Sequence, residues 1–148
     1  MATVYGVNKT KMNNPIGSNI LDSGVNKGQV CAMYDSYEAS GLALGSVIQM
    51  CDTLPKGALV MEIALITDNL GGSATLDIGD TEDDDRYASA IDISGQATTY
   101  NWPVTTAGAN IANLGYVVGT ATSDDQIALT INTSAVTGTI KLVVKYMV

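Results

Sequence analysis

Apolar and polar residues alternate in short runs along most of the chain after residue 29. In the clearest run, Leu76 and Ile78 share one side and Asp77 lies on the other. A period of two indicates a β-strand with one buried face. The segments with strand texture are 30–38, 42–50, 59–68, 73–79, 86–94, 114–122, 126–134 and 139–148. We therefore predict an all-β sandwich or barrel of about seven or eight strands.

The same period predicts which side chains form the core. The residues expected to face it are Leu76, Ile78, Ile127, Leu129, Ile131, Ile140, Leu142, Val144 and Tyr146. Segment 59–68 is apolar on both faces, as in a central strand that is covered on both sides. Residues that favour turns cluster at Ser40-Gly41, 53–58, 69–72 and 135–138. These features assign 30–148 to a single sandwich domain.

Two segments lack a strand pattern. Residues 1–29 are rich in Asn and Gly, and their apolar residues are irregularly spaced. We expect an extended N-terminal arm or a series of turns there, without a helix. Residues 94–113 are polar and rich in Thr, and a connection of that length in a compact domain is usually functional or disordered. Trp102 is expected to pin the middle of this connection to the domain.

The charge and the composition narrow the classes of function. The net charge is −8 with only seven Lys and Arg, which argues against nucleic-acid binding, because that binding needs basic residues to neutralise phosphates. An anionic membrane surface is disfavoured for the same reason. No run approaches the roughly 18 apolar residues of a membrane span, and the first residues lack the apolar core of a secretory signal. We expect synthesis in a cytoplasm, with Cys31 and Cys51 free; a disulfide across a hairpin is the alternative.

The residue types needed for common catalytic sites are scarce. The chain contains no His, which removes the commonest general base and the imidazole metal ligand. It contains no Walker-type loop and no GxGxxG motif, and two cysteines do not make a tetrahedral thiolate zinc site. Glu62 lies inside an apolar strand, but pairing with Lys56 or Arg86 explains it more simply than acid catalysis. We predict that the protein is not an enzyme and needs no cofactor.

Six acidic residues crowd into the nine positions 77–85. An EF-hand loop beginning at Asp80 would need Gly at its sixth position and Glu at its twelfth, and the chain has Asp and Ile there. A looser calcium site built on Asp80, Glu82 and Asp84 is one alternative, and a contact with a basic partner surface is another. The favoured interpretation is a hydrated loop without metal, which ends strand 73–79 and discourages edge-to-edge pairing.

The middle of the chain resembles a known family. The segments that carry the resemblance are "YDSYE" (34–38), "GSVIQM" (45–50), "LPKGA" (54–58), "LGGSATLDIGD" (70–80) and "DDRY" (84–87). Over 34–90 the chain is similar to small virion structural proteins of tailed bacteriophages, the head decoration or cement proteins. The resemblance implies a jelly-roll-like β-sandwich located in the virion. It also implies that the protein decorates and stabilises the capsid shell, with the major capsid protein and neighbouring copies of itself as partners in a homo-oligomer.

The candidate partner-binding residues lie in the two segments without a strand pattern. Lys9 and Lys11 give the arm a positive charge that would suit an acidic partner, such as the 77–85 loop of another copy. An alternative function is a carbohydrate- or receptor-binding β-sandwich of a virion, which would stack its ligand on exposed aromatic rings. Tyr100 and Trp102, with Tyr116, are the candidates for that contact.

Overall fold

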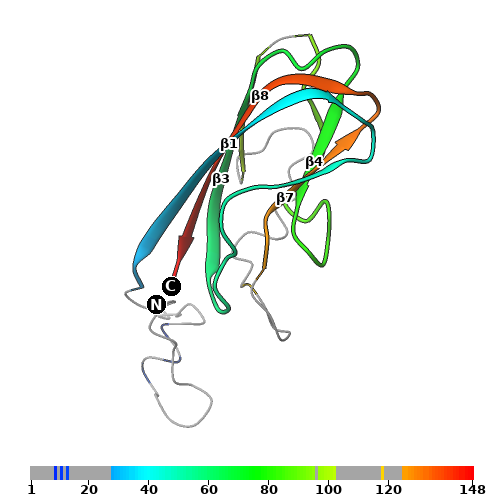
Figure 1. Ribbon diagram of the computed structural model, residues 1–148. Helices are drawn as coiled ribbons and strands as arrows, with labels where there is room; N and C mark the ends of the chain where they lie inside the picture. The colour runs from blue at the N-terminus through cyan, green and yellow to red at the C-terminus, as the bar shows by residue number, and fades with distance from the viewer. Residues whose placement is uncertain are drawn as a thin grey trace, which may run out of the picture.

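The computed structural model describes residues 9, 11, 13, 28–95, 97–102, 118 and 125–148. Within them the chain forms eight strands: β1 (Val30–Leu42), β2 (Val47–Gln49), β3 (Leu59–Thr67), β4 (Thr75–Gly79), β5 (Ala88–Asp92), β6 (Thr98–Trp102), β7 (Ala128–Asn132) and β8 (Val136–Met147). They build two four-stranded sheets that face each other (Figure 1). The prediction of an all-β sandwich is confirmed. In the described part of the chain, no helix is long and apolar enough to cross a membrane.

The strand order is that of a jelly roll. Sheet A has the order β1-β8-β3-β6 and sheet B the order β2-β7-β4-β5. Strand β1 pairs with β8, β2 with β7, β3 with β6 and β4 with β5, all antiparallel. The chain thus behaves as one long hairpin whose halves stay paired, and further pairing of β8 with β3 and of β7 with β4 completes the two sheets. This rolled hairpin confirms the predicted jelly-roll-like architecture.

The core fills the space between the two sheets. The predicted inward-facing residues Leu76, Ile78, Ile127, Leu129, Ile131, Ile140, Leu142 and Val144 are all fully buried, and Tyr146 packs partly buried against them. The single Trp supplies the largest of the fully buried side chains, and its ring meets that of Tyr87 edge to face, with 5.2 Å between the centroids. The period of two therefore identified the correct face of each of these strands.

Two predicted turns are wrong. Strand β1 continues through Ser40-Gly41. A β-bulge shifts the register of its pairing with β8 at this point, and Gly41 has a positive φ of 65°. At the other end of the chain, β8 already begins at Val136, so 135–138 is not a turn. Gly138 serves close packing instead, because a Cβ there would come within 2.9 Å of a methyl carbon of Leu70.

The polar connection 94–113 conceals a strand. Residues 98–102 form β6, which pairs with β3 at the edge of sheet A. The predicted strand 114–122 lies outside the described residues except for Val118. This residue is buried, and its backbone forms hydrogen bonds with the backbones of Gly57 and Ala58.

In the N-terminal segment, Lys9, Lys11 and Asn13 have helical backbone, where turns or extended chain were expected.

Among the described residues, strand β3 is covered on one side only. Its inward residues Val60, Ile63 and Leu65 are fully buried, whereas Met61 and Ile66 are exposed on the outer side of sheet A. The prediction that both faces of 59–68 are covered is therefore wrong within the subunit. The reason is that a two-layer sandwich places a second layer against only one side of each sheet.

Candidate functional site: the acidic loop and its groove

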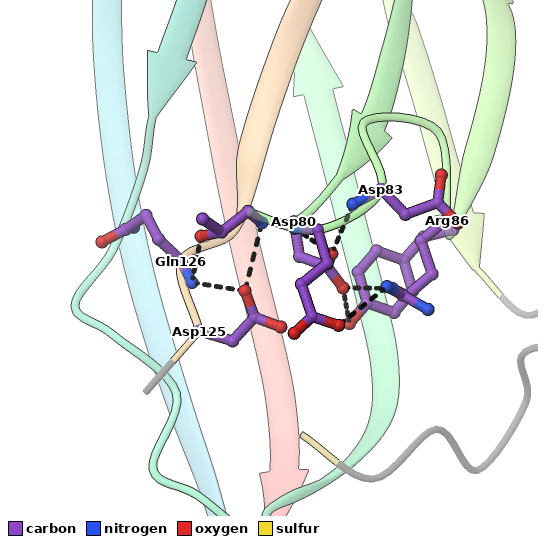
Figure 2. Close-up of polar contacts among 8 residues, drawn as sticks. Asp80, Asp83, Arg86, Asp125 and Gln126 are labelled. Carbon is purple, nitrogen blue, oxygen red and sulfur yellow. Dashed lines mark hydrogen bonds and ion pairs between the residues drawn. The ribbon is translucent and has the colours of Figure 1, made fainter. Parts of the chain in front are cut away.

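The acidic loop, residues 80–86, connects β4 to β5 and is built around a buried carboxylate. Asp80 is only 4% exposed and forms an ion pair with Arg86. Its Oδ1 accepts hydrogen bonds from the backbone N–H groups of Glu82, at 3.1 Å, and Asp83, at 3.0 Å, and the hydroxyl of Tyr87 lies 3.5 Å from Oδ2 (Figure 2). The expectation of a wholly hydrated loop is therefore wrong at Asp80, which organises the loop from inside.

A second carboxylate ties the loop to sheet B. Asp125, also 4% exposed, precedes β7 and accepts hydrogen bonds from the backbone N–H of Thr81, at 3.1 Å, and of Gln126, at 3.0 Å (Figure 2). The side-chain amide of Gln126 donates in turn to the carbonyl oxygen of Met50, at 2.8 Å. The loop is thereby fixed to β7 and to the end of β2. Sequence reasoning missed Asp125 and Gln126, although a polar pair directly before an alternating strand was a signal for such an anchor.

The charges of the loop are only partly compensated. Burial raises the pKa of the Asp80 carboxyl, the hydrogen bond from Arg86 acts in the opposite direction, and the nearby charge of Asp125 adds to the rise. A hydrogen bond with the neighbouring Asp83 carboxyl raises the pKa of Asp85. Because Arg86 is engaged mainly with Asp80, the outer part of the loop presents a negative surface.

The residues of the alternative calcium site, Asp80, Glu82 and Asp84, do not come together. Asp80 is committed to Arg86 and to two N–H groups, which leaves Glu82 and Asp84 without it. Among the described residues, the carboxylates whose oxygens lie within 4.8 Å of one another are those of Asp83, Asp84 and Asp85. They are neighbours in sequence on an exposed turn, a common arrangement of hydrated acids, so we assign no metal to them.

A groove of about 400 Å³ lies beside the acidic loop on the outer side of sheet B. Its lining residues are Gly45, Val47, Gln49, Asp80, Thr81, Asp84, Gln126, Ala128 and Thr130. The apolar side chains of Val47 and Ala128 lie next to the acidic rim, and the lining contains no aromatic ring. A sugar-binding site usually presents such a ring for stacking, so this groove does not have the make-up of one.

The predicted aromatic contact residues are inside the protein. Tyr100 is 2% exposed and Trp102 is fully buried, because β6 belongs to sheet A and alternate residues of a strand point into the sandwich. Their prediction as partner-binding residues is therefore wrong, and Tyr116 lies outside the described residues. Lys9 is exposed and Lys11 is partly exposed.

The other candidate side chains are also accounted for. Glu62 pairs with Lys145 at 2.9 Å on the outer side of sheet A, and not with Lys56 or Arg86 as expected. Cys31 and Cys51 are both free thiols. Burial, and then the nearby Asp35 carboxylate, raises the pKa of Cys51 to about 11, so this thiol is a poor nucleophile at neutral pH.

Gly79, the last residue of β4, allows the acidic loop to fold back. A methyl group on this residue would overlap main-chain atoms of Asp83 and Asp84, and rotation of a side chain does not relieve such an overlap. We expect Gly79→Ala to lower the free energy of unfolding by about 1–3 kcal/mol in urea denaturation. Gly72→Ala is the matched control, because nothing lies within 4 Å of a Cβ placed there. Equal effects of the two substitutions would contradict the folded-back geometry.

Comparison with known proteins gives similarity of fold alone. No family model matches the chain, and no curated protein matches it. The chain is similar to a chain in the solved structure of the cyanophage Pam1 capsid asymmetric unit, with 22% identity, a TM-score of 0.61, and coverage of 82% of this chain and 86% of that chain. It is also similar to a chain in the capsid of Ralstonia phage GP4, with 19% identity, a TM-score of 0.61, and coverage of 81% and 84%. At these identities the likeness establishes the shared jelly-roll fold.

Proposed function

We propose that this chain is a structural protein of a tailed-bacteriophage virion, which decorates the capsid shell and stabilises it through contacts with the major capsid protein and with copies of itself. The observation that carries the proposal is the fold shared with chains of two phage capsids. The match spans more than four-fifths of each chain, so those capsid chains are nearly as long as this one. A single sandwich of this length suits an accessory subunit that binds a shell.

The described surfaces support a role in protein–protein contacts better than a role in catalysis. The acidic loop is held rigidly by Asp80 and Asp125, and its outer carboxylates are available to a basic partner. A preorganised charged loop favours a specific docking geometry, because little ordering entropy is lost on binding. In this proposal the protein acts without enzymatic activity, is made in the host cytoplasm, and ends in the virion.

The N-terminal arm, residues 1–29, is assigned in this proposal to assembly and 30–148 to the sandwich. Backbone hydrogen bonds join Gln29 to Val148 at 2.9 and 3.1 Å, so the sandwich ladder starts where the arm ends. Lys9 and Lys11 would then bring positive charge to an acidic surface of the shell or of a neighbouring copy.

The test is co-sedimentation of the purified protein with assembled heads that lack it. We expect saturable binding by the full chain. A variant without residues 2–28 should keep nearly the same melting temperature and lose binding. The proposal would be overturned if neither the full chain nor the truncated variant sediments with heads and the full chain binds a glycan array. That result would favour a carbohydrate-binding virion module.

A further inference from the structure

The outer face of sheet A exposes a concentration of large apolar side chains. Four of them stand out: Val30 is 56% exposed, Tyr34 63%, Met61 40% and Ile66 45%. They come from β1 and β3, which flank β8 on this side of the molecule (Figure 1). An exposed apolar patch on a soluble subunit commonly marks an interaction surface.

Strand register arranges these side chains into continuous rows across the sheet. Tyr34 of β1 stands opposite Val143 of β8, which stands opposite Ala64 of β3. A second row joins Val30, Met147 and Leu59 in the same way. Between the two rows, Lys145 is paired with Glu62 at 2.9 Å. These two rows are thus apolar and have one ion pair between them, while Lys141 of β8 stands opposite Ile66 beyond the Tyr34 row.

The pattern of β3 indicates that this face is covered in the working protein. Its sequence is apolar on both sides, as in a strand with a layer on each face. Of the described residues, those facing β3 supply only the inner layer, since Met61 and Ile66 remain exposed. A second molecule would supply the other layer.

The charge distribution favours a second copy of this chain as that layer. The strand residues of the face carry two positive and two negative side chains, namely Lys141, Lys145, Glu38 and Glu62. Their charges cancel, so the net charge of −8 lies elsewhere on the chain. Two copies repel one another where acidic surfaces meet. This neutral, apolar face is where they approach without that penalty.

The area of the face is sufficient for a stable contact. Strands β1, β8 and β3 contain 13, 12 and 9 residues. At about 3.4 Å per residue and about 4.8 Å between strands, these three strands and the five residues of β6 cover roughly 600 Å². This approaches the ~800 Å² that each partner buries in a typical stable complex.

We propose that the outer face of sheet A, centred on Tyr34, Val143 and Ile66, is the interface between copies of this chain. This proposal rests on the proposed function, because it names the surface through which copies would form the homo-oligomer. The acidic loop and the arm remain available to contact the shell. Copies joined through one sheet face would display their acidic loops away from that contact, because the loops are anchored to sheet B.

The experiment measures self-association of the full chain by light scattering and sedimentation over a range of concentrations. We expect the wild type to form an oligomer, and Tyr34→Glu and Ile66→Glu each to weaken association by about 30-fold or more, the effect of losing an interface hot spot. Leu44→Glu is the matched control, because Leu44 is 62% exposed, as Tyr34 is 63%, yet precedes β2 of sheet B. Circular dichroism and melting verify that each variant is folded.

Three results would overturn the proposal: a wild type that is monomeric at all concentrations, variants at Tyr34 and Ile66 that associate normally, or loss of association only in Leu44→Glu. If one variant fails to fold, the other still decides the question, because Tyr34 and Ile66 lie on different strands. The same variants in the head-binding assay separate the two proposals. Monomeric variants that still bind heads would leave the shell contact standing, whereas an oligomer that binds no heads would reject that contact alone.

Discussion

Replacing Asp80 with alanine is expected to lower the free energy of unfolding by about 3–5 kcal/mol, the cost of removing one partner from a buried ion pair. Arg86 would then keep its charge in a mostly buried place, since only 14% of its side chain is exposed. The backbone N–H groups of Glu82 and Asp83 would lose their shared acceptor as well. Urea denaturation monitored by circular dichroism measures the change.

The variant Asp80→Asn separates the two contributions. It retains an oxygen acceptor for the N–H groups and removes only the negative charge that faces Arg86, so its cost should fall between those of wild type and Asp80→Ala. Combining Asp80→Asn with Arg86→Met removes both charges, and the double variant should be more stable than the sum of the single effects predicts. Additive effects in this cycle would show that the ion pair contributes nothing to the loop.

Replacing Trp102 with alanine is expected to cost about 3–5 kcal/mol of unfolding free energy. The side chain is fully buried, and its ring packs edge to face against that of Tyr87, with 79° between the planes. Alanine would leave a cavity that the two sheets are too rigid to fill. The loss should appear as a lower midpoint in urea denaturation with an unchanged slope.

The neighbouring residue provides the control for this substitution. Asn101 lies on the same strand and is exposed, so Asn101→Ala should change the unfolding free energy by no more than about 0.5 kcal/mol. A small effect at Trp102 would place this ring outside the core. It would then restore the possibility of an aromatic contact surface on β6.

The sequence predicted where the acidic loop lies in the chain, but not how its side chains are arranged. The run of acids after 73–79 correctly indicated a loop at the end of a strand, because like charges repel and stay near water. The burial of Asp80 was not foreseeable from that run. It depends on Arg86 and Tyr87 reaching the carboxylate in space and on Asp125, which binds Thr81 from 44 positions away.

The strands, too, were only partly predictable from the sequence. Local periodicity alone was enough to place most strands and to select their inward faces, because alternation is a property of neighbouring residues. The strand 98–102 escaped this reasoning, since its Thr and Asn residues carry little pattern and it is held by pairing with β3. Segment 59–68 showed two apolar faces, and tertiary structure decided which one the subunit buries. Pairings between distant segments made these decisions, and such pairings leave no mark in a short window of residues.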